Sequence, residues 1–218
     1  MIEGTRKAAN AGGSDDEPGG SSEMAYMGAG RSACVIRLTA RSASVPDALA
    51  SAFSLKAVRE LAADASKNRV GAADLAFWVS AHESAHCLFD SAKRMNLIDT
   101  SWSGQFKAPR SWIDSQSAGD LDNAVLARTE EVAADLMAAG WARQALGRQQ
   151  AGRLIQLVQR GRRLGSRYDQ DDLHESSTAL GDQALNDEAN GQVNGKDLMF
   201  SVWSLARSDT LRALEGGA

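Results

Sequence analysis

Apolar residues recur at intervals of three and four positions over most of the chain after residue 44, which is the spacing of amphipathic helices. This pattern predicts helices over residues 45–68, 71–95, about 120–145, 149–165 and 196–214. Pro46 suits the first turn of the first helix, where a missing N–H costs nothing. We therefore expect a mainly α fold.

The residues before this helical region follow a different pattern. Residues 1–31 are rich in Gly, Ser, Asp and Glu, with GGSDDEPGGSS at their centre. Such a segment buries too little apolar surface to order itself, so we expect a disordered N-terminal arm. The run ACVIRLT at 33–39 is the only convincing strand in the sequence. The expected organisation is an arm over 1–31 and a single domain over 32–218 with at most a small β element.

One short motif, HESAH at residues 82–86, lies in the middle of the predicted helix 71–95. Residues four apart on an α-helix are separated by about 40° and roughly 6 Å, so His82 and His86 leave the same face and can bind one metal ion. Glu83 lies about 100° away from His82 and can instead reach a water bound to that metal. It would then act as the general base.

Two histidines on one helix face could also be plain polar surface, because HExxH arises by chance in helical proteins. Two observations favour a metal site. The chain has 3 histidines, and two of them form this pair. The flanking runs AFWVSA and CLF are apolar, which indicates a buried helix, and buried imidazoles need partners.

A zinc site with an open water position needs a third protein ligand. The best candidate is Glu131, in the run RTEEVAAD at 128–135. Glu131 and Asp135 are four apart and share a helix face, so Asp135 can accept the free N–H of a ligand histidine and fix its tautomer. Glu130 would point about 100° away from that face. A solvated helix face is the alternative for these acids, and the apolar residues between and after them disfavour it.

HESAH followed by EVAAD resembles the HExxH…ExxAD pattern of the gluzincin zinc metallopeptidases. The second run is also similar to that of prenyl-protease-like enzymes and of metallopeptidase-like domains in some antirestriction proteins. The resemblance covers about residues 70–145 and implies that the domain over 32–218 is zincin-like, with its active-site core at about 70–145. The helical part over about 149–218 completes the same domain. It implies a zinc endopeptidase, acting on a protein or peptide, with these roles: zinc ligands His82, His86 and Glu131, base Glu83, and Asp135 orienting an imidazole.

The sequence also offers other candidates for the third metal ligand. In membrane AAA proteases a distant aspartate replaces the glutamate, and the candidates here are Asp120, Asp122, Asp182 and Asp187. His174 could also replace Glu131, or it could stabilise the oxyanion of a tetrahedral intermediate, as could Tyr168. The sequence has no P-loop, so we expect no ATP-driven protease.

The same site also fits a protein of another class. A non-catalytic zinc-binding regulatory or interaction protein, such as a phage or plasmid encodes, could keep a zincin-like fold. A fourth protein ligand, for example His174, would close the site and favour that alternative. A site open to a cleft would favour the enzyme, and the aromatic residues of the connection over 96–119 could line such a cleft or pack it onto the core: Trp102, Phe106 and Trp112.

A run of arginines follows the EVAAD motif and contains no acid: Arg143, Arg148, Arg153, Arg160, Arg162, Arg163 and Arg167. It could meet nucleic acid, an anionic membrane surface or an acidic partner. The run lacks interleaved aromatic residues, and the acidic stretch after it could neutralise it. We therefore favour a solvated helix face over a nucleic-acid interface.

Charge, hydropathy and cysteine content indicate which compartment and which partners to expect. The net charge is −4, which does not indicate a polyanion-binding protein. No apolar run is long enough to span a bilayer, and the first residues lack the apolar region of a secretory signal. The two cysteines, Cys34 and Cys87, form no disulfide framework and no CxxC pair, which fits a reducing compartment. We therefore expect a cytoplasmic protein.

Overall fold

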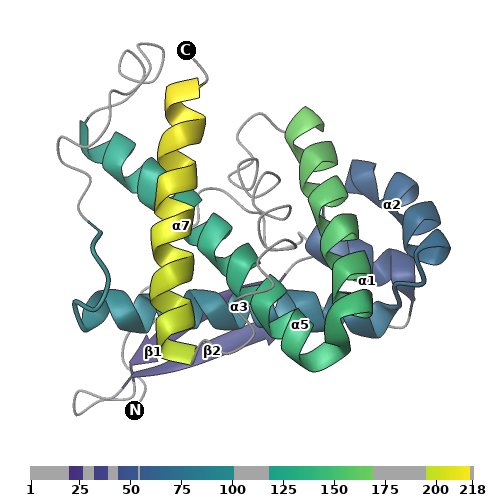
Figure 1. Cartoon of the computed structure of the whole chain (residues 1–218), viewed down its shortest axis with the longest axis horizontal. Helices are drawn as coiled ribbons and strands as arrows, with labels where there is room; N and C mark the ends of the chain where they lie inside the picture. The colour runs from purple at the N-terminus through teal and green to yellow at the C-terminus, as the bar shows by residue number, and fades with distance from the viewer. Residues whose placement is uncertain are drawn as a thin grey trace.

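The computed structural model describes residues 20–26, 32–38, 44–53, 55–100, 118–168 and 195–216. These residues form a mostly helical domain, which confirms the predicted fold class (Figure 1). Its elements in chain order are β1 Gly20–Tyr26, β2 Ser32–Leu38, α1 Val45–Ala52, α2 Leu55–Lys67, α3 Ala72–Arg94, α5 Ala118–Tyr168 and α7 Gly195–Gly216.

The helix predicted over 45–68 is two helices, α1 and α2. Ser44 caps α1, since its hydroxyl accepts the N–H of Asp47 at 3.3 Å. The chain leaves α1 at Phe53, which has an extended backbone (φ −143°, ψ 162°). Apolar spacing alone does not reveal this break, because both helices bury their apolar faces in the same core.

The predicted helix over 71–95 is confirmed as α3, which crosses the lower half of the molecule in Figure 1. Its start is fixed by Asp74, whose carboxylate accepts the N–H of Gly71 at 2.8 Å. Its end is fixed by Asn96, which takes a left-handed conformation (φ 52°), while Leu97 donates back to the carbonyl of Ala92 at 2.9 Å. Both ends of the helix that carries HESAH are thus capped.

The two helices predicted over 120–145 and 149–165 are the two arms of α5, and they meet at a kink. Gly147 forms the kink with φ 75° and ψ 160°, a conformation that a residue with a Cβ rarely adopts. We call residues 118–146 the first arm and 148–168 the second arm. Figure 1 shows the second arm turning away from the first to run beside α1 and α2.

The buried side chains form two clusters, and α3 belongs to both. The first cluster joins α1, α2 and residues from both arms of α5 to the N-terminal half of α3, up to Ala81. The second joins α7 and the first arm of α5 to the C-terminal half of α3, from Ala85 onward, with the rings of Phe89 and Trp203 5.3 Å apart. The HESAH motif therefore lies where the two clusters meet.

An antiparallel hairpin of β1 and β2 packs against α3, with Gly20 opposite Leu38 and Tyr26 opposite Ser32. β2 confirms the predicted strand, but β1 lies inside the segment that we expected to be disordered. Composition averaged over the whole arm hides the run SEMAY, which follows the Gly-rich part and pairs with β2. The rest of the predicted arm, residues 1–19 and 27–31, lies outside the described residues.

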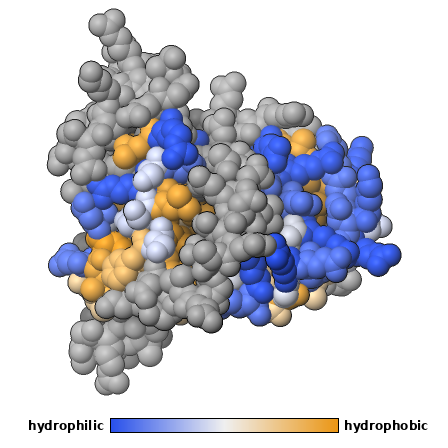
Figure 2. All heavy atoms as spheres, in the orientation of Figure 1, coloured by the Kyte–Doolittle hydropathy of each residue, from blue (hydrophilic) through white to orange (hydrophobic). Residues whose placement is uncertain are grey.

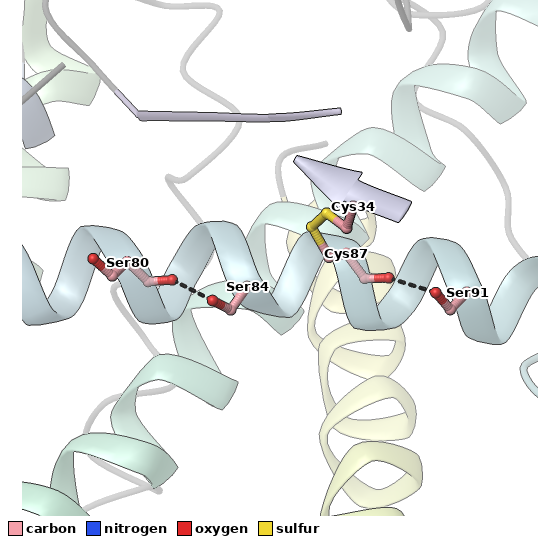
Figure 3. The surroundings of a disulfide bond; sticks show 5 residues. All are labelled: Cys34, Ser80, Ser84, Cys87 and Ser91. Carbon is pink, nitrogen blue, oxygen red and sulfur yellow. Dashed lines mark hydrogen bonds between the residues drawn. A yellow bond between two sulfur atoms is a disulfide. The ribbon is translucent and has the colours of Figure 1, made fainter. Parts of the chain in front are cut away.

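A disulfide joins Cys34 of β2 to Cys87 of α3, as Figure 3 shows. The expectation of two unpaired cysteines was therefore wrong. The pairing could not be read from the sequence, since 53 positions separate the two cysteines and only the packing of the hairpin on α3 brings them together. Disulfides persist in oxidising surroundings, so the cysteines no longer support the predicted reducing compartment.

Within the part of the chain that the structure describes, no helix is both long and apolar enough to cross a membrane. Figure 2 shows mainly hydrophilic side chains over α1, α2 and the second arm of α5, whereas hydrophobic atoms reach the surface on the side of α7. Among the described residues, the large apolar side chains with the most exposure are Val35, Ile36, Met95 and Leu97.

Candidate metal centre

His82 and His86 lie one turn apart on the same face of α3, as their spacing predicts. Their Nε2 atoms are 3.1 Å apart, and the two rings meet edge to face at a centroid distance of 4.7 Å. The side chain of His82 is 8% exposed and that of His86 is 16% exposed. Both imidazoles are therefore mostly buried, and His86 is the more exposed of the two.

The first arm of α5 brings Glu131 to this pair. Its Oε2 lies 3.2 Å from Nε2 of His82 and 3.5 Å from Nε2 of His86. The three donor atoms form a nearly equilateral triangle. Ligand atoms at about 2.0–2.1 Å from a tetrahedral zinc ion lie about 3.3–3.4 Å from one another, so the triangle has the size that this ion requires. Among the described residues, these three make up the candidate metal cluster.

The corners of the triangle are electron-pair donors, so the site attracts a positive charge. Nδ1 of His82 lies 2.8 Å from Oδ1 of Asp135, which accepts its proton, so Nε2 is the atom that faces Glu131 and can take up either a second proton or a metal ion. Burial lowers the pKa of His82, but hydrogen bonds to Asp135 and Glu131 outweigh this effect and raise the pKa to about 10. These groups therefore favour a cation between them, either a proton or a metal ion.

Asp135 is itself fixed by Arg162, from the second arm of α5. Nε of Arg162 donates to Oδ2 at 3.1 Å, and Nη2 donates to Oδ1 at 3.0 Å. The expectation of a solvated arginine face is wrong at this position, because the side chain of Arg162 is only 11% exposed. The sequence did hold a signal: Arg162 lies four residues after Val158 and seven after Ile155, which are both buried.

Glu130, next to Glu131, points elsewhere. Its Oε1 accepts a hydrogen bond from Nζ of Lys93 at 2.7 Å, and Lys93 also pairs with Asp90 at 2.6 Å. Burial raises the pKa of Glu130, and the charge of Lys93 only partly opposes that rise. The structure thus brings Glu131 rather than Glu130 to the histidine pair, and Glu130 instead forms a half-buried ion pair with Lys93.

Glu83 is buried, with 8% exposure, at the junction of the two core clusters. It follows His82 directly, which puts it about 100° away around α3, so it does not belong to the triangle. Its role as a base stays a prediction.

Several other predicted residues lie outside the described part of the chain: His174, Asp182, Asp187 and the aromatic residues Trp102, Phe106 and Trp112. Tyr168 is the last residue of α5, and Asp120 and Asp122 belong to its first turns. The structure does not describe the side chains of Tyr168, Asp120 and Asp122. Their proposed roles stay predictions.

No family model, curated protein or solved structure matches the chain. The likeness to gluzincins therefore rests on two short motifs, and the function has to be argued from the geometry of the site.

Proposed function

We propose that the protein is a zinc-dependent hydrolase of peptide bonds. The observation that carries the proposal is the triangle of His82 Nε2, His86 Nε2 and Glu131 Oε2, with sides of 3.1, 3.2 and 3.5 Å. Two imidazoles and one carboxylate are a donor set used by catalytic zinc sites, which keep the fourth position for water or substrate. Imidazole nitrogens also favour zinc over calcium and magnesium, which prefer oxygen ligands.

The charge of the ligand set suits hydrolysis. Two neutral imidazoles and one carboxylate would leave a bound zinc ion with a net positive charge, as an electrophile needs. When bound, zinc lowers the pKa of a coordinated water and polarises the carbonyl of the substrate. Glu83, beside His82, would take the proton of the attacking water and deliver it to the leaving amine.

The remaining contacts serve to orient the ligands. Asp135 holds the proton on Nδ1 of His82, so that Nε2 is the atom available to the metal. This distribution of roles between Glu131, which would bind the ion, and Asp135, which would bind the ligand, matches the order of the two acids in the gluzincin pattern.

The proposal is tested by metal analysis and peptide cleavage with matched variants. Purified protein should contain about one zinc per chain and should cleave members of a fluorogenic peptide library. Glu83→Gln should abolish cleavage but keep the zinc, whereas Glu60→Gln, at an exposed glutamate of α2, should change neither. Loss of zinc in Glu83→Gln would contradict its role as base. A zinc-loaded protein that cleaves no peptide would instead favour the non-catalytic regulatory or interaction protein.

A further inference from the structure

Three buried side chains form a continuous series that ends at the candidate metal centre. The guanidinium of Arg162 binds both oxygens of Asp135, at 3.1 and 3.0 Å, and Oδ1 of Asp135 binds Nδ1 of His82 at 2.8 Å. The side chains of Arg162, Asp135 and His82 are 11%, 8% and 8% exposed. Water therefore has little access to these bonds, and each partner depends on the next for its orientation.

We propose that Arg162 is a positioning residue of the metal site, which orients His82 through Asp135. The inference rests on the proposed metal site but does not require that the protein cleaves peptides. A carboxylate that binds only one imidazole can rotate about its own axis and offer either oxygen. The fork of Arg162 occupies both oxygens in one plane, so Oδ1 stays directed at Nδ1 and the ring keeps Nε2 on the side of Glu131.

The architecture of α5 supports a dedicated role for this contact. Arg162 and Asp135 belong to one helical element and are 27 residues apart. In a straight helix they would be separated by about 40 Å, at 1.5 Å per residue. The kink at Gly147 folds the second arm back and brings the two side chains into contact.

A buried guanidinium is costly unless it is paired and packed. Arg162 has Asp135 as its ion pair, and its Cζ lies 5.5 Å from the centre of the Phe53 ring. Phe53 reaches that place because Gly161 precedes Arg162: a Cβ at position 161 would lie 2.3 Å from Cε1 of Phe53. The end of α1 thus covers the guanidinium, and a glycine makes room for it.

The pair also affects the charge of the site. Asp135 alone would add a buried negative charge beside a ligand histidine, whereas Arg162 and Asp135 together add none. The positive charge that the ligand set leaves on a bound zinc ion is therefore preserved. Lysine could restore the charge but not the fork, since its ammonium group cannot bind two oxygens in one plane as the guanidinium does.

The test measures metal binding with zinc and cobalt alone. Arg162→Met should weaken zinc binding by about 10- to 100-fold, the usual effect of losing a group that orders a metal ligand. Arg162→Lys should recover part of the loss, and Arg163→Gln, at the exposed neighbouring position, should bind zinc as the unmodified protein does. The visible absorption spectrum of bound cobalt should change in Arg162→Met, because the direction of one imidazole changes.

A second readout keeps the proposal testable without any metal. In nitrogen-15 NMR of the histidine rings, the unmodified protein should show a protected, hydrogen-bonded Nδ1 proton on His82, and Arg162→Met should lose that protection. Circular dichroism identifies a variant that fails to fold, in which case Arg162→Lys carries the test. Unchanged zinc affinity and an unchanged His82 signal in folded Arg162→Met would overturn the proposal, and so would an equal loss in Arg163→Gln. A protein that binds zinc as described but cleaves no peptide would contradict only the proposed hydrolase.

Discussion

His82 and Asp135 are 53 residues apart in the chain, yet Nδ1 and Oδ1 are joined by a hydrogen bond of 2.8 Å. This contact links the first arm of α5 to α3 and leaves Nε2 of His82 facing Glu131. The imidazole of His82 thus contacts two carboxylates, the buried one of Asp135 and the half-buried one of Glu131. The carboxylates that attract a proton to this ring are the same groups that would attract a metal ion.

Zinc binding should therefore depend on pH. Burial lowers the pKa of His82, but Asp135 and Glu131 outweigh that effect and raise it to about 10, so we expect the ring of the metal-free protein to carry a second proton, on Nε2, at neutral pH. Zinc must displace that proton, and the apparent affinity should rise about tenfold per pH unit as long as one proton is released. Zinc titrations at several pH values in two buffers with different ionisation enthalpies measure the released proton. An affinity independent of pH between about 6 and 8 would contradict the assignment.

The raised pKa of His82 also makes the stability of the metal-free protein depend on pH. The folded pKa of His82 lies above its ordinary value of 6.5, so the protonated ring stabilises the folded state. That contribution is fully present below the unfolded pKa of about 6.5 and is lost as the pH rises through the folded pKa. Zinc should remove this dependence, because it replaces the proton.

The adjacent glutamates provide a matched pair of variants. Glu131→Gln should weaken zinc binding by roughly one to several orders of magnitude, because the charged donor at the third corner is lost. Glu130→Gln should leave zinc affinity nearly unchanged and lower the free energy of unfolding by about 1 kcal/mol, because Lys93 loses one of its two carboxylate partners. Zinc titration and urea denaturation of both variants measure the two effects. The reverse ranking in zinc affinity would contradict the candidate site.

The disulfide should stabilise the fold without binding metal. Cys34→Ser should lower the free energy of unfolding by about 2–4 kcal/mol, since the bond closes a loop of 53 residues in the unfolded chain. The double variant Cys34→Ser/Cys87→Ser should lose no more than the single one. Zinc content should persist in both, because the triangle contains no sulfur. If a thiol reductant leaves the unmodified protein's urea midpoint unchanged, the bond does not form in solution.

Two truncations separate the parts of the predicted arm. Removing residues 1–19 should leave the melting temperature nearly unchanged, since this segment is too polar to bury a core. Removing residues 1–31 should lower it, because the deletion takes β1 away from β2 and exposes the part of α3 that the hairpin covers. Thermal unfolding followed by circular dichroism compares the two. Equal melting temperatures would mean that β1 adds nothing to stability.

Sequence patterns predicted the parts of this structure that depend on local spacing. The four-residue interval between His82 and His86, and again between Glu131 and Asp135, places each pair on one helix face, and those faces meet in the structure. The helices themselves follow from apolar periodicity. The choice of Glu131 over Glu130 followed from the rotation of a helix by about 100° per residue, together with Asp135 four residues on, on the face of Glu131.

The features that the sequence did not reveal depend on long-range packing. The spacing of Arg162 from Val158 and Ile155 could indicate that it is buried, but its contact with Asp135 depends on the direction of the second arm, which the backbone of Gly147 sets. The bond between Cys34 and Cys87 depends on how the hairpin lies on α3. β1 escaped prediction because a strand at the end of a polar segment gains its hydrogen bonds from a partner and not from its own composition.

The position of the HESAH motif between the two buried clusters has a thermodynamic consequence. Ala81 belongs to one cluster and Ala85 to the other, so the turn of α3 that carries His82 is common to both. Arg162 approaches from the second arm and Glu131 from the first. A ligand that binds only the folded state, and is present at about 1,000 times its dissociation constant, adds about 4 kcal/mol to the free energy of unfolding. Zinc bound at this location would add that energy to both clusters at once, so we expect the zinc-loaded protein to unfold as one cooperative unit.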